Sequence, residues 1–367
     1  MEEKRMATAY VSGVLTCESP LAQLEGRDER NEKTLLLKHR TDSYLVQKRT
    51  WIEGTGEEGD KGHYETVEGE YMVANILAPS SNTLRAKIRD LLSRDIALKV
   101  GALGPKTLFF MTGGGGGFDE KVSKGATIQL IRSIREKNVV AGLLGGSIGG
   151  AIIPGKVVVG IPVLYCRDLV NYMPRGVRGK DGTEMPTDPA ALPEAWNFLT
   201  RKMYTRHDDF NIPEVADMLN EAGRDMLAKE EYSRGEKEEG KKKDVKRQAI
   251  YTIESVAAGA QYWSHFFLRK PSARELGGFL KTLKLFSKDP YIGGLSSKGL
   301  GEISLAYDVV VNYADGSYGK GRVLANTDRA KSFEVREDSD GIVESAMASY
   351  ESWLAGTTAE SLDVDSL

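Results

Sequence analysis

Residues 289–304 read DPYIGGLSSKGLGEIS and join an amphipathic stretch to a run of alternating apolar residues. Glycines flank a short polar loop here, and the loop carries one lysine. Glycine accepts positive φ, and successive backbone N–H groups beside a lysine suit an anion such as phosphate. A tight turn that leads into a β-strand explains the same residues without a ligand, so both interpretations stay open. The loop residues concerned are Gly293, Gly294, Ser297, Lys298, Gly299 and Gly301.

The composition is that of a globular protein, with 367 residues of which 40% are hydrophobic and 28% charged. This length suffices for one elaborated domain or two ordinary ones. A net charge of -3 argues against a uniformly basic nucleic-acid coat but allows a local basic groove. Two cysteines and four histidines lack ligand spacing, so no metal or cofactor is expected. The charged N-terminal residues and the lack of a long apolar run predict a cytoplasmic protein without a membrane span.

Hydrophobic periodicity predicts an α+β fold. Residues 8–18 alternate as a half-buried strand does, and residues 83–98 place apolar side chains at helical spacing. Strand–helix–strand repeats with long excursions predict helices on one face of an antiparallel sheet, with the ferredoxin-like motif as the simplest candidate. Strands are also expected at 34–37 and 43–51 as a hairpin, and at 64–77, 106–111, 156–166, 261–268 and 307–324; helices are expected at 125–137, 212–227, 272–287 and 342–354.

The start of the helix at 83–98 is a candidate phosphate site. Ser80, Ser81 and Asn82 are good N-cap residues, and Arg85 and Arg89 are expected on or beside the exposed faces. A helix N-terminus offers unpaired N–H groups, and nearby arginines add positive charge. An ordinary capped surface helix would show the same residues, so this reading competes with a purely structural one.

Three other glycine motifs have less support. Residues 54–59 spell GxGxxG but carry acidic residues and precede no helix, and residues 150–156 spell GxxxxGK without the Ser or Thr that holds magnesium. Residues 145–149 fit GxSxG, which would make Ser147 a nucleophile with Asp208 and His265 as later partners. A nucleophile elbow must lead into a helix, whereas a β-rich run follows here. A serine hydrolase centred on Ser147 is the alternative function.

Four segments, together with the stretch at 289–304, recur in an order that resembles the CRISPR-associated RAMP superfamily. The form most similar is the backbone subunit of type IV effector complexes, and the resemblance spans about residues 7–311. The segments are SGVLTCESPLAQLEG at 12–26, APSSNTLRAKIRDLL at 78–92, LLGGSIGGAIIPGKVVV at 143–159 and YTIESVAAGAQYWSHFFL at 251–268.

The resemblance implies a modified ferredoxin-like or RNA-recognition-motif palm with inserted finger and thumb segments. On this basis residues 1–166 form the first part of the palm with finger insertions, and residues 167–248 an inserted thumb. Residues 249–355 complete the palm, and residues 356–367 form a flexible acidic tail. The family's subunits stack along a CRISPR RNA and hold it for pairing with target DNA, so that base pairing reads the sequence.

The implied partners are CRISPR RNA, complementary target DNA, further copies of the chain, and other effector subunits including a guide-processing ribonuclease, cap subunits and a helicase. No catalytic role is expected, because Asp28 lies in a loop where cutting relatives carry an aspartate but its surroundings do not match. A single-stranded nucleic-acid binder outside CRISPR systems remains a further option. The implied RNA-binding residues are Ser80, Ser81, Asn82, Arg85, Arg89, Gly145, Gly146, Ser147 and the six loop residues given first; the implied thumb residues are Tyr172, Met173, Arg175, Arg178 and Arg206.

Overall fold

The computed structural model describes residues 5–31, 34–52, 63–114, 127–148, 151–207, 221, 225, 248–328, 332–338 and 340–364. The chain divides into two compact units. Unit 1 comprises Met1–Leu24, His39–Thr200 and Ser255–Leu367, and unit 2 comprises Glu25–Lys38 and Arg201–Glu254. In the described part of the chain, no helix is both long and apolar enough to cross a membrane.

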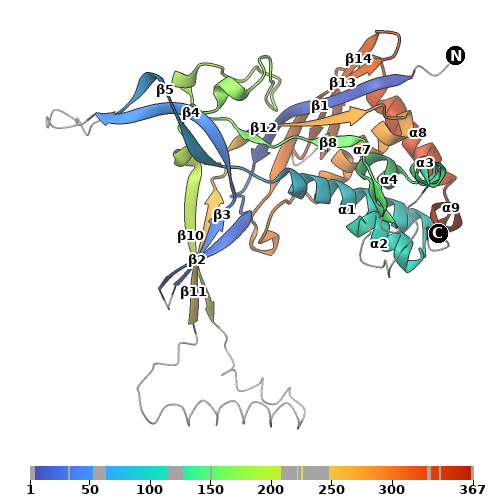
Figure 1. Ribbon diagram of the computed structural model, residues 1–367, viewed down its shortest axis with the longest axis horizontal. Helices are drawn as coiled ribbons and strands as arrows, with labels where there is room; N and C mark the ends of the chain where they lie inside the picture. Colours follow the sequence, from blue (N-terminus) through green and yellow to red (C-terminus); the bar gives the residue numbers. More distant parts are fainter. Residues whose placement is uncertain are drawn as a thin grey trace. The chain divides into compact units, whose positions relative to one another are not determined.

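Unit 1 is organised around one antiparallel sheet (Figure 1). Its strand order is β15-β14-β13-β1-β12-β8, and β9 also pairs with β12. The central strand β1 pairs with β12 on one side and β13 on the other, so that Val11 lies opposite both Phe266 and Val309. The strands are β1 Met6–Cys17, β8 Val157–Val159, β9 Val163–Leu164, β12 Gln261–Arg269, β13 Ile303–Tyr313, β14 Tyr318–Ala325 and β15 Phe333–Arg336.

The connections follow the ferredoxin-like β-α-β-β-α-β order. Helix α1 (Ser81–Val100) follows β1 and precedes β8, and helix α7 (Ala273–Phe286) connects β12 to β13. In the sheet these four strands lie in the order β13-β1-β12-β8, so each helix crosses over a neighbouring strand. The expected α+β class with antiparallel sheets is therefore confirmed.

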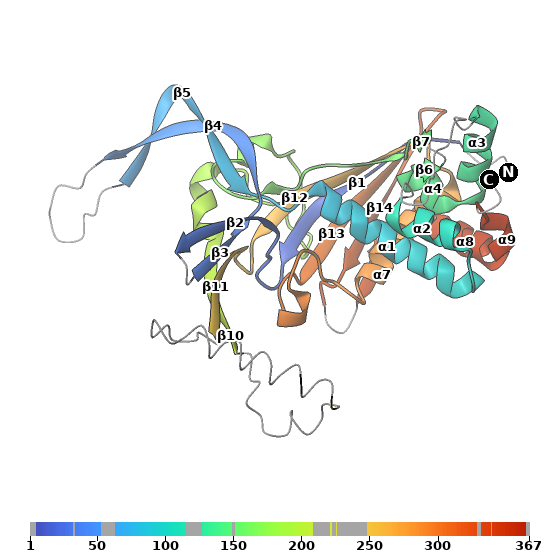
Figure 2. The same cartoon turned by 60° about the horizontal axis from the view of Figure 1, so that its bottom comes forward.

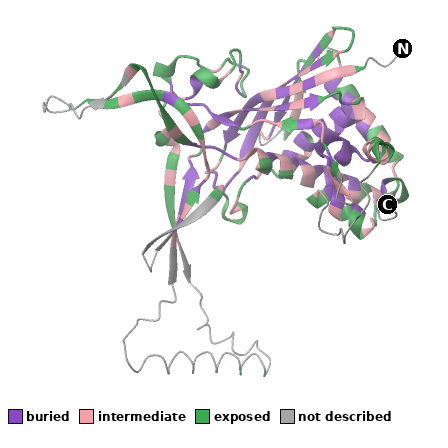
Figure 3. Ribbon diagram, viewed as in Figure 1, coloured by how far each residue is buried: buried purple, intermediate pink, exposed green. Residues whose placement is uncertain are grey.

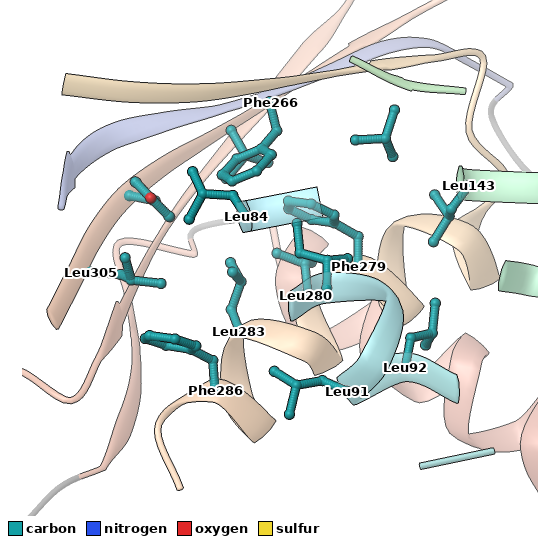
Figure 4. Packing of buried hydrophobic residues seen from close by; sticks show 14 of the residues in the cluster. Leu84, Leu91, Leu92, Leu143, Phe266, Phe279, Leu280, Leu283, Phe286 and Leu305 are labelled. Carbon is teal, nitrogen blue, oxygen red and sulfur yellow. The ribbon is translucent and has the colours of Figure 1, made fainter. Parts of the chain in front are cut away.

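Both crossover helices and α8 (Ile342–Ala355) cover one face of this sheet, as the two views of the ribbon show (Figures 1 and 2). Burial follows the predicted alternation over the first part of β1, where Ala9 and Val11 are buried, whereas Gly13–Cys17 are buried on both faces of the strand. Buried residues concentrate between sheet and helices (Figure 3). Leucines of α1, among them Leu84 and Leu91, belong with Phe279 of α7 to the buried cluster found there (Figure 4). Burial of such side chains from water supplies the main driving force for this fold.

Helix α7 begins at a capping box. The sequence pattern at 272–287 predicted the helix but not this cap. Ser272 and Glu275 exchange side-chain and backbone hydrogen bonds, and the buried Glu275 also receives Lys156 Nζ at 2.6 Å. This cap satisfies otherwise unpaired N–H groups at the helix start. It also ties α7 to the residue that precedes β8.

Several expected elements differ in the structure. Residues 106–111, predicted as a strand, lie in helix α2 (Pro105–Gly113), because a short apolar run fits either element and Pro105 at the first position favours a helix. The strand expected at 156–166 is split into β8 and β9, with Gly160 passing over His265. The predicted flexible tail instead includes α9 (Ala359–Leu362), and Leu362 and Val364 are buried.

The remaining elements of unit 1 are short or project as hairpins. Strands β4 (Thr41–Ile52) and β5 (His63–Leu77) form a long two-stranded hairpin. The predicted helix at 125–137 is present as α3 (Ile128–Lys137), and α4 (Val139–Leu144) leads into the hairpin of β6 (Gly146–Ile148) and β7 (Ala151–Ile153). Single turns of 3₁₀ helix are η1 (Val170–Tyr172), η2 (Pro189–Ala191), η3 (Ala195–Phe198) and η4 (Ser296–Lys298).

Unit 2 is built on a four-stranded sheet of order β10-β11-β3-β2. Strand β3 runs parallel to β11 and does not form the hairpin with β4 that the sequence predicted, because β4 pairs with β5. Tyr204 and Tyr251 stack across β10 and β11 with ring centroids 5.7 Å apart. The helix predicted at 212–227 falls almost wholly outside the described residues. The strands are β2 Leu24–Asn31, β3 Thr34–His39, β10 Leu199–His207 and β11 Gln248–Val256.

Candidate nucleic-acid interface

The loop after α7 folds back onto the residues that follow β1. The Gly301 N–H donates to the Pro20 carbonyl at 2.8 Å. Gly293 and Gly301 have φ of 77° and 84°. A Cβ added at Gly293 would lie 2.6 Å from the Ala22 oxygen, and one at Gly301 would lie 2.0 Å from the Ile292 oxygen. These two glycines are therefore required by the closure of the loop itself, with or without a ligand.

The tip of this loop is exposed and carries unpaired donors. Leu295 has a left-handed φ of 65° and precedes the turn η4, which ends at Gly299 with φ of 74°. Ser296 and Ser297 are exposed, as is the neighbouring Lys298. Among the described residues, no protein acceptor meets the backbone N–H of Leu295, Ser296 or Ser297. Successive N–H groups of this kind form a concave site for an anion.

The start of α1 lies beside this loop. The Ser80 side chain accepts the Asn82 N–H at 3.1 Å, which confirms the predicted N-cap. The Ser80 N–H donates to Gln23 Oε1 at 2.8 Å, while the adjacent Ala22 carbonyl accepts the Gly294 N–H at 2.8 Å. The first turn of α1 contains no acidic residue. The segment at 22–23 thus holds the helix start and the glycine loop together, and Gln23 has no sequence signature that would have indicated this role.

A salt bridge forms a second link between the same elements. Lys87 Nζ lies 2.7 Å from Asp289 Oδ2, which connects the second turn of α1 to the residue before the loop. Two of the three predicted RNA-binding segments are therefore neighbours in space.

Arg85 and Arg89 of α1, expected on or beside the exposed faces, are half-buried, and both guanidinium groups donate to backbone carbonyls of the protein. Arg89 donates to the carbonyls of Leu144 at 3.1 Å and Gly145 at 2.9 Å. Arg85 donates to the Leu144 carbonyl and, at 3.1 Å, to that of Val157. Burial lowers the pKa of Arg89 to about 10, with a smaller contribution from the Arg85 charge. Since that value is well above neutral pH, the Arg89 guanidinium stays charged and binds the carbonyl end of α4.

The middle glycine segment is packed against protein. Gly145 has φ of 65°, and a Cβ there would lie 2.1 Å from the Ile153 oxygen. A Cβ on Gly146 would lie 2.3 Å from the Phe110 ring. The Ser147 N–H donates to the Gly114 carbonyl at 2.6 Å. The close packing of neighbouring atoms therefore explains why residues 145 and 146 are glycines.

The same segment lacks the geometry of a nucleophile elbow. Ser147 lies on β6, which pairs antiparallel with β7, whereas the elbow requires a helix after the serine. His265 lies on β12 in contact with aromatic rings, at 4.5 Å from Trp263 and 5.8 Å from Tyr10 between centroids. Asp208 lies outside the described residues. The structure therefore does not support the hydrolase alternative.

The predicted thumb residues take different positions. The Tyr172 hydroxyl donates to the Leu45 carbonyl at 2.5 Å, and the ring lies edge-on to Tyr44 at 5.8 Å. Met173 is half-buried and packs on the core, whereas Arg175 is exposed. Arg206 belongs to β10, and its side chain lies outside the described residues.

Arg178 is engaged in an ion-pair network on the sheet. It donates to both oxygens of Glu337, at 2.9 and 3.0 Å, and to Asp308 at 2.7 Å. The hydrogen bond with Asp308 raises the pKa of Arg178. Arg322, which is only 1% exposed, binds the same Asp308 at 2.9 Å and the Gly179 carbonyl. These contacts fix the segment around Arg178 over β13 and β14.

The described residues contain no group of three or more His, Cys, Asp or Glu side chains placed to hold a metal ion. No protein-family model and no curated protein matches this chain. Among solved structures, the fold is similar to a chain described as "Type IV-B CRISPR Complex". The match covers 84% of this chain and 91% of the other at 14% sequence identity, with a TM-score of 0.42. A likeness at this level concerns the course of the chain and assigns no role to any residue.

Proposed function

We propose that this protein is a non-catalytic backbone subunit of a CRISPR effector complex, which binds the CRISPR RNA backbone and holds the guide for pairing with target DNA. Copies of the chain stack along the guide, beside the other effector subunits, in a cytoplasmic complex. The unit 1 sheet acts as the RNA-recognition-motif palm, and the inserted segments, with unit 2 among them, act as finger and thumb. The proposal builds on the sequence resemblance and on the geometry of unit 1.

One observation carries the proposal most directly. The cap of α1 and the tip of the 293–301 loop lie side by side, held by the segment at 22–23. Exposed polar side chains, unpaired backbone N–H groups and the absence of acidic residues in the first turn of α1 suit a run of phosphates. Contacts of this type fix register without reading sequence, which is what a guide-holding subunit requires. Here Ser81, Asn82, Ser297 and Lys298 are the side chains proposed to face the RNA.

The proposal is tested on protein purified from cells that also produce guide RNA. An RNA of defined size is expected to co-purify, and the affinity of the protein for this RNA is expected to fall steeply as the salt concentration rises. Ser297→Asp places a negative charge at the loop tip and is expected to weaken RNA binding on the order of tenfold, equally for all guide sequences.

Ser345→Asp is the matched control. Ser345 is exposed on α8, so this variant carries the same change in net charge at a distance from the loop. Its affinity is expected to equal that of the wild type. A wild-type protein that retains no RNA, or equal weakening by the two substitutions, would contradict the proposed site and function.

A further inference from the structure

The sheet face opposite the helices carries aromatic side chains on its central strands. Because β1 pairs in register with both neighbours, Tyr10 lies opposite Phe267 of β12 and Val310 of β13. Val310 lies in turn opposite Lys320 of β14. Their neighbours along each strand point into the core, as the buried Ala9, Val11, Phe266 and Leu268 show. One row across this helix-free face is therefore aromatic at its centre and cationic at its edge.

A third ring lies in the adjacent row, on β14, where Tyr318 is opposite Asn312. Tyr318 is 63% exposed, and Lys320 Nζ lies 5.2 Å from its ring centroid. On the opposite side, Val158 of β8 pairs with Phe267 and is 39% exposed. Aromatic and aliphatic groups thus line the face from β14 to β8, with Tyr318 and Val158 exposed and the rings between them half-buried. A contiguous accessible apolar surface of this kind marks a binding site.

The open part of this face has a clear boundary. Toward the other end of the same strands, Val14, Ala306 and Leu324 are at most 2% exposed. Beside them, the Arg178 and Arg322 network holds residues 178–179 over the sheet. The protein therefore covers one half of its helix-free face with its own chain and leaves the half with Tyr10, Phe267 and Tyr318 accessible.

The charges around the open half are mainly positive. Arg269 continues β12 beyond Phe267 on the same face, and it is exposed together with Lys320, Lys270 and Arg5. Among the described carboxylates nearby, Asp308 is bound by two arginines and Asp315 accepts the Ser317 hydroxyl at 2.6 Å. Flat rings bordered by cations complement unpaired bases and their phosphates.

We propose that Tyr10, Phe267 and Tyr318 form a stacking surface for unpaired bases of single-stranded RNA, with Lys320 and Arg269 beside the phosphates. The RNA is that of the proposed function, on which this inference rests, but the contact is distinct from the loop tip and from the cap of α1. The arrangement also agrees with a general mode of recognition in which aromatic residues on a four-stranded sheet stack two or three bases.

The test uses the intact protein and a fluorescein-labelled oligouridylate that contains 4-thiouridine. Irradiation is expected to crosslink the RNA to peptides that contain Tyr10, Phe267 or Tyr318, identified by mass spectrometry. The double variant Tyr10→Leu with Tyr318→Leu keeps apolar side chains on the strands but removes both rings, and it is expected to raise Kd at least about tenfold. The double variant with phenylalanine at the same positions retains the rings and is expected to bind like the wild type.

The outcomes separate this inference from the proposed function. In one outcome, guide RNA co-purifies and Ser297→Asp weakens its binding, but the leucine variant binds like the wild type and no crosslink reaches these strands. This result refutes the stacking surface and leaves the loop site supported. If the wild type binds neither guide RNA nor oligouridylate, the proposed function fails and the inference fails with it. Two results would refute RNA as the occupant of this surface. One is ring-dependent binding that is tighter for oligothymidylate than for oligouridylate. The other is a leucine variant that changes the size of the assembly without a change in RNA affinity. Thermal unfolding of each variant shows whether it is folded.

Discussion

Substituting Arg89 by methionine distinguishes a structural arginine from a phosphate ligand. The side chain of Arg89 leaves α1 and donates to the carbonyls of Leu144 and Gly145 at 3.1 and 2.9 Å, with longer contacts to Phe110 and Met111 at 3.5 and 3.3 Å. Methionine retains the apolar stem but offers no donor. The four carbonyl groups then lose a charged partner in a part-buried position, where an unsatisfied acceptor is costly.

The magnitude follows from the two shorter bonds. A hydrogen bond to a charged group contributes about 1.5–3 kcal/mol, and the longer contacts add little, so the free energy of unfolding is expected to fall by about 3 kcal/mol. With an unfolding entropy of about 2.1 cal/mol/K per residue over 367 residues, a loss of this size lowers the midpoint of thermal unfolding by about 4 °C. Arg89→Lys, which keeps the charge but reaches fewer carbonyls, is expected to lie between methionine and the wild type.

Arg94→Met provides the control on the same helix. Its side chain is 60% exposed and, within the described part of the chain, pairs with Asp90 at 2.8 Å, so the expected change is within about 0.5 kcal/mol. Thermal unfolding and RNA affinity are measured on all three variants. If Arg89→Met unfolds like Arg94→Met but binds RNA at least ten times more weakly, the arginine contacts phosphate and our structural assignment is refuted.

Further consequences concern packing, the ion-pair network and pH. Gly277→Ala would place a Cβ 1.9 Å from the Ala346 oxygen, so urea unfolding is expected to show a loss of about 2 kcal/mol or more, and an unchanged midpoint would contradict the close contact of α7 and α8. Arg322→Met leaves Asp308 without its buried partner; limited proteolysis between residues 175 and 184 is expected to accelerate, and an unaltered digestion pattern would contradict the network's role. Burial lowers the pKa of His265 from 6.5, so the folded state disfavours its charged form and stability falls as pH drops below that value. His265→Phe is therefore expected to lose less stability between pH 7 and pH 5, in thermal melts, than the wild type.

The sequence alone predicted features that depend on near neighbours in the chain. Alternation over 8–18 predicted β1, and the cap residues before 83 placed the start of α1 with its Ser80 cap. These signals are reliable because a strand or a helix start is decided by residues a few positions apart. The α+β class and the ferredoxin-like order followed from the succession of such elements. Pro105 was available as a helix signal, but the apolar run after it was interpreted as a strand.

The tertiary structure decided what each functional-looking residue does. Glycine runs suggested ligand contact, yet Gly145 and Gly301 are glycines because backbone oxygens lie where a Cβ would be. Arg89 occupies the same position on α1 whether it binds phosphate or supports the fold. Only the packing of Gly145 against α1 showed that its guanidinium binds a backbone carbonyl. The surface formed by Tyr10, Phe267 and Tyr318 joins three strands that are not consecutive in sequence, so it exists only once the register of the sheet is known. Local propensity acts over a few residues, whereas such a surface is made by backbone hydrogen bonds between strands hundreds of residues apart.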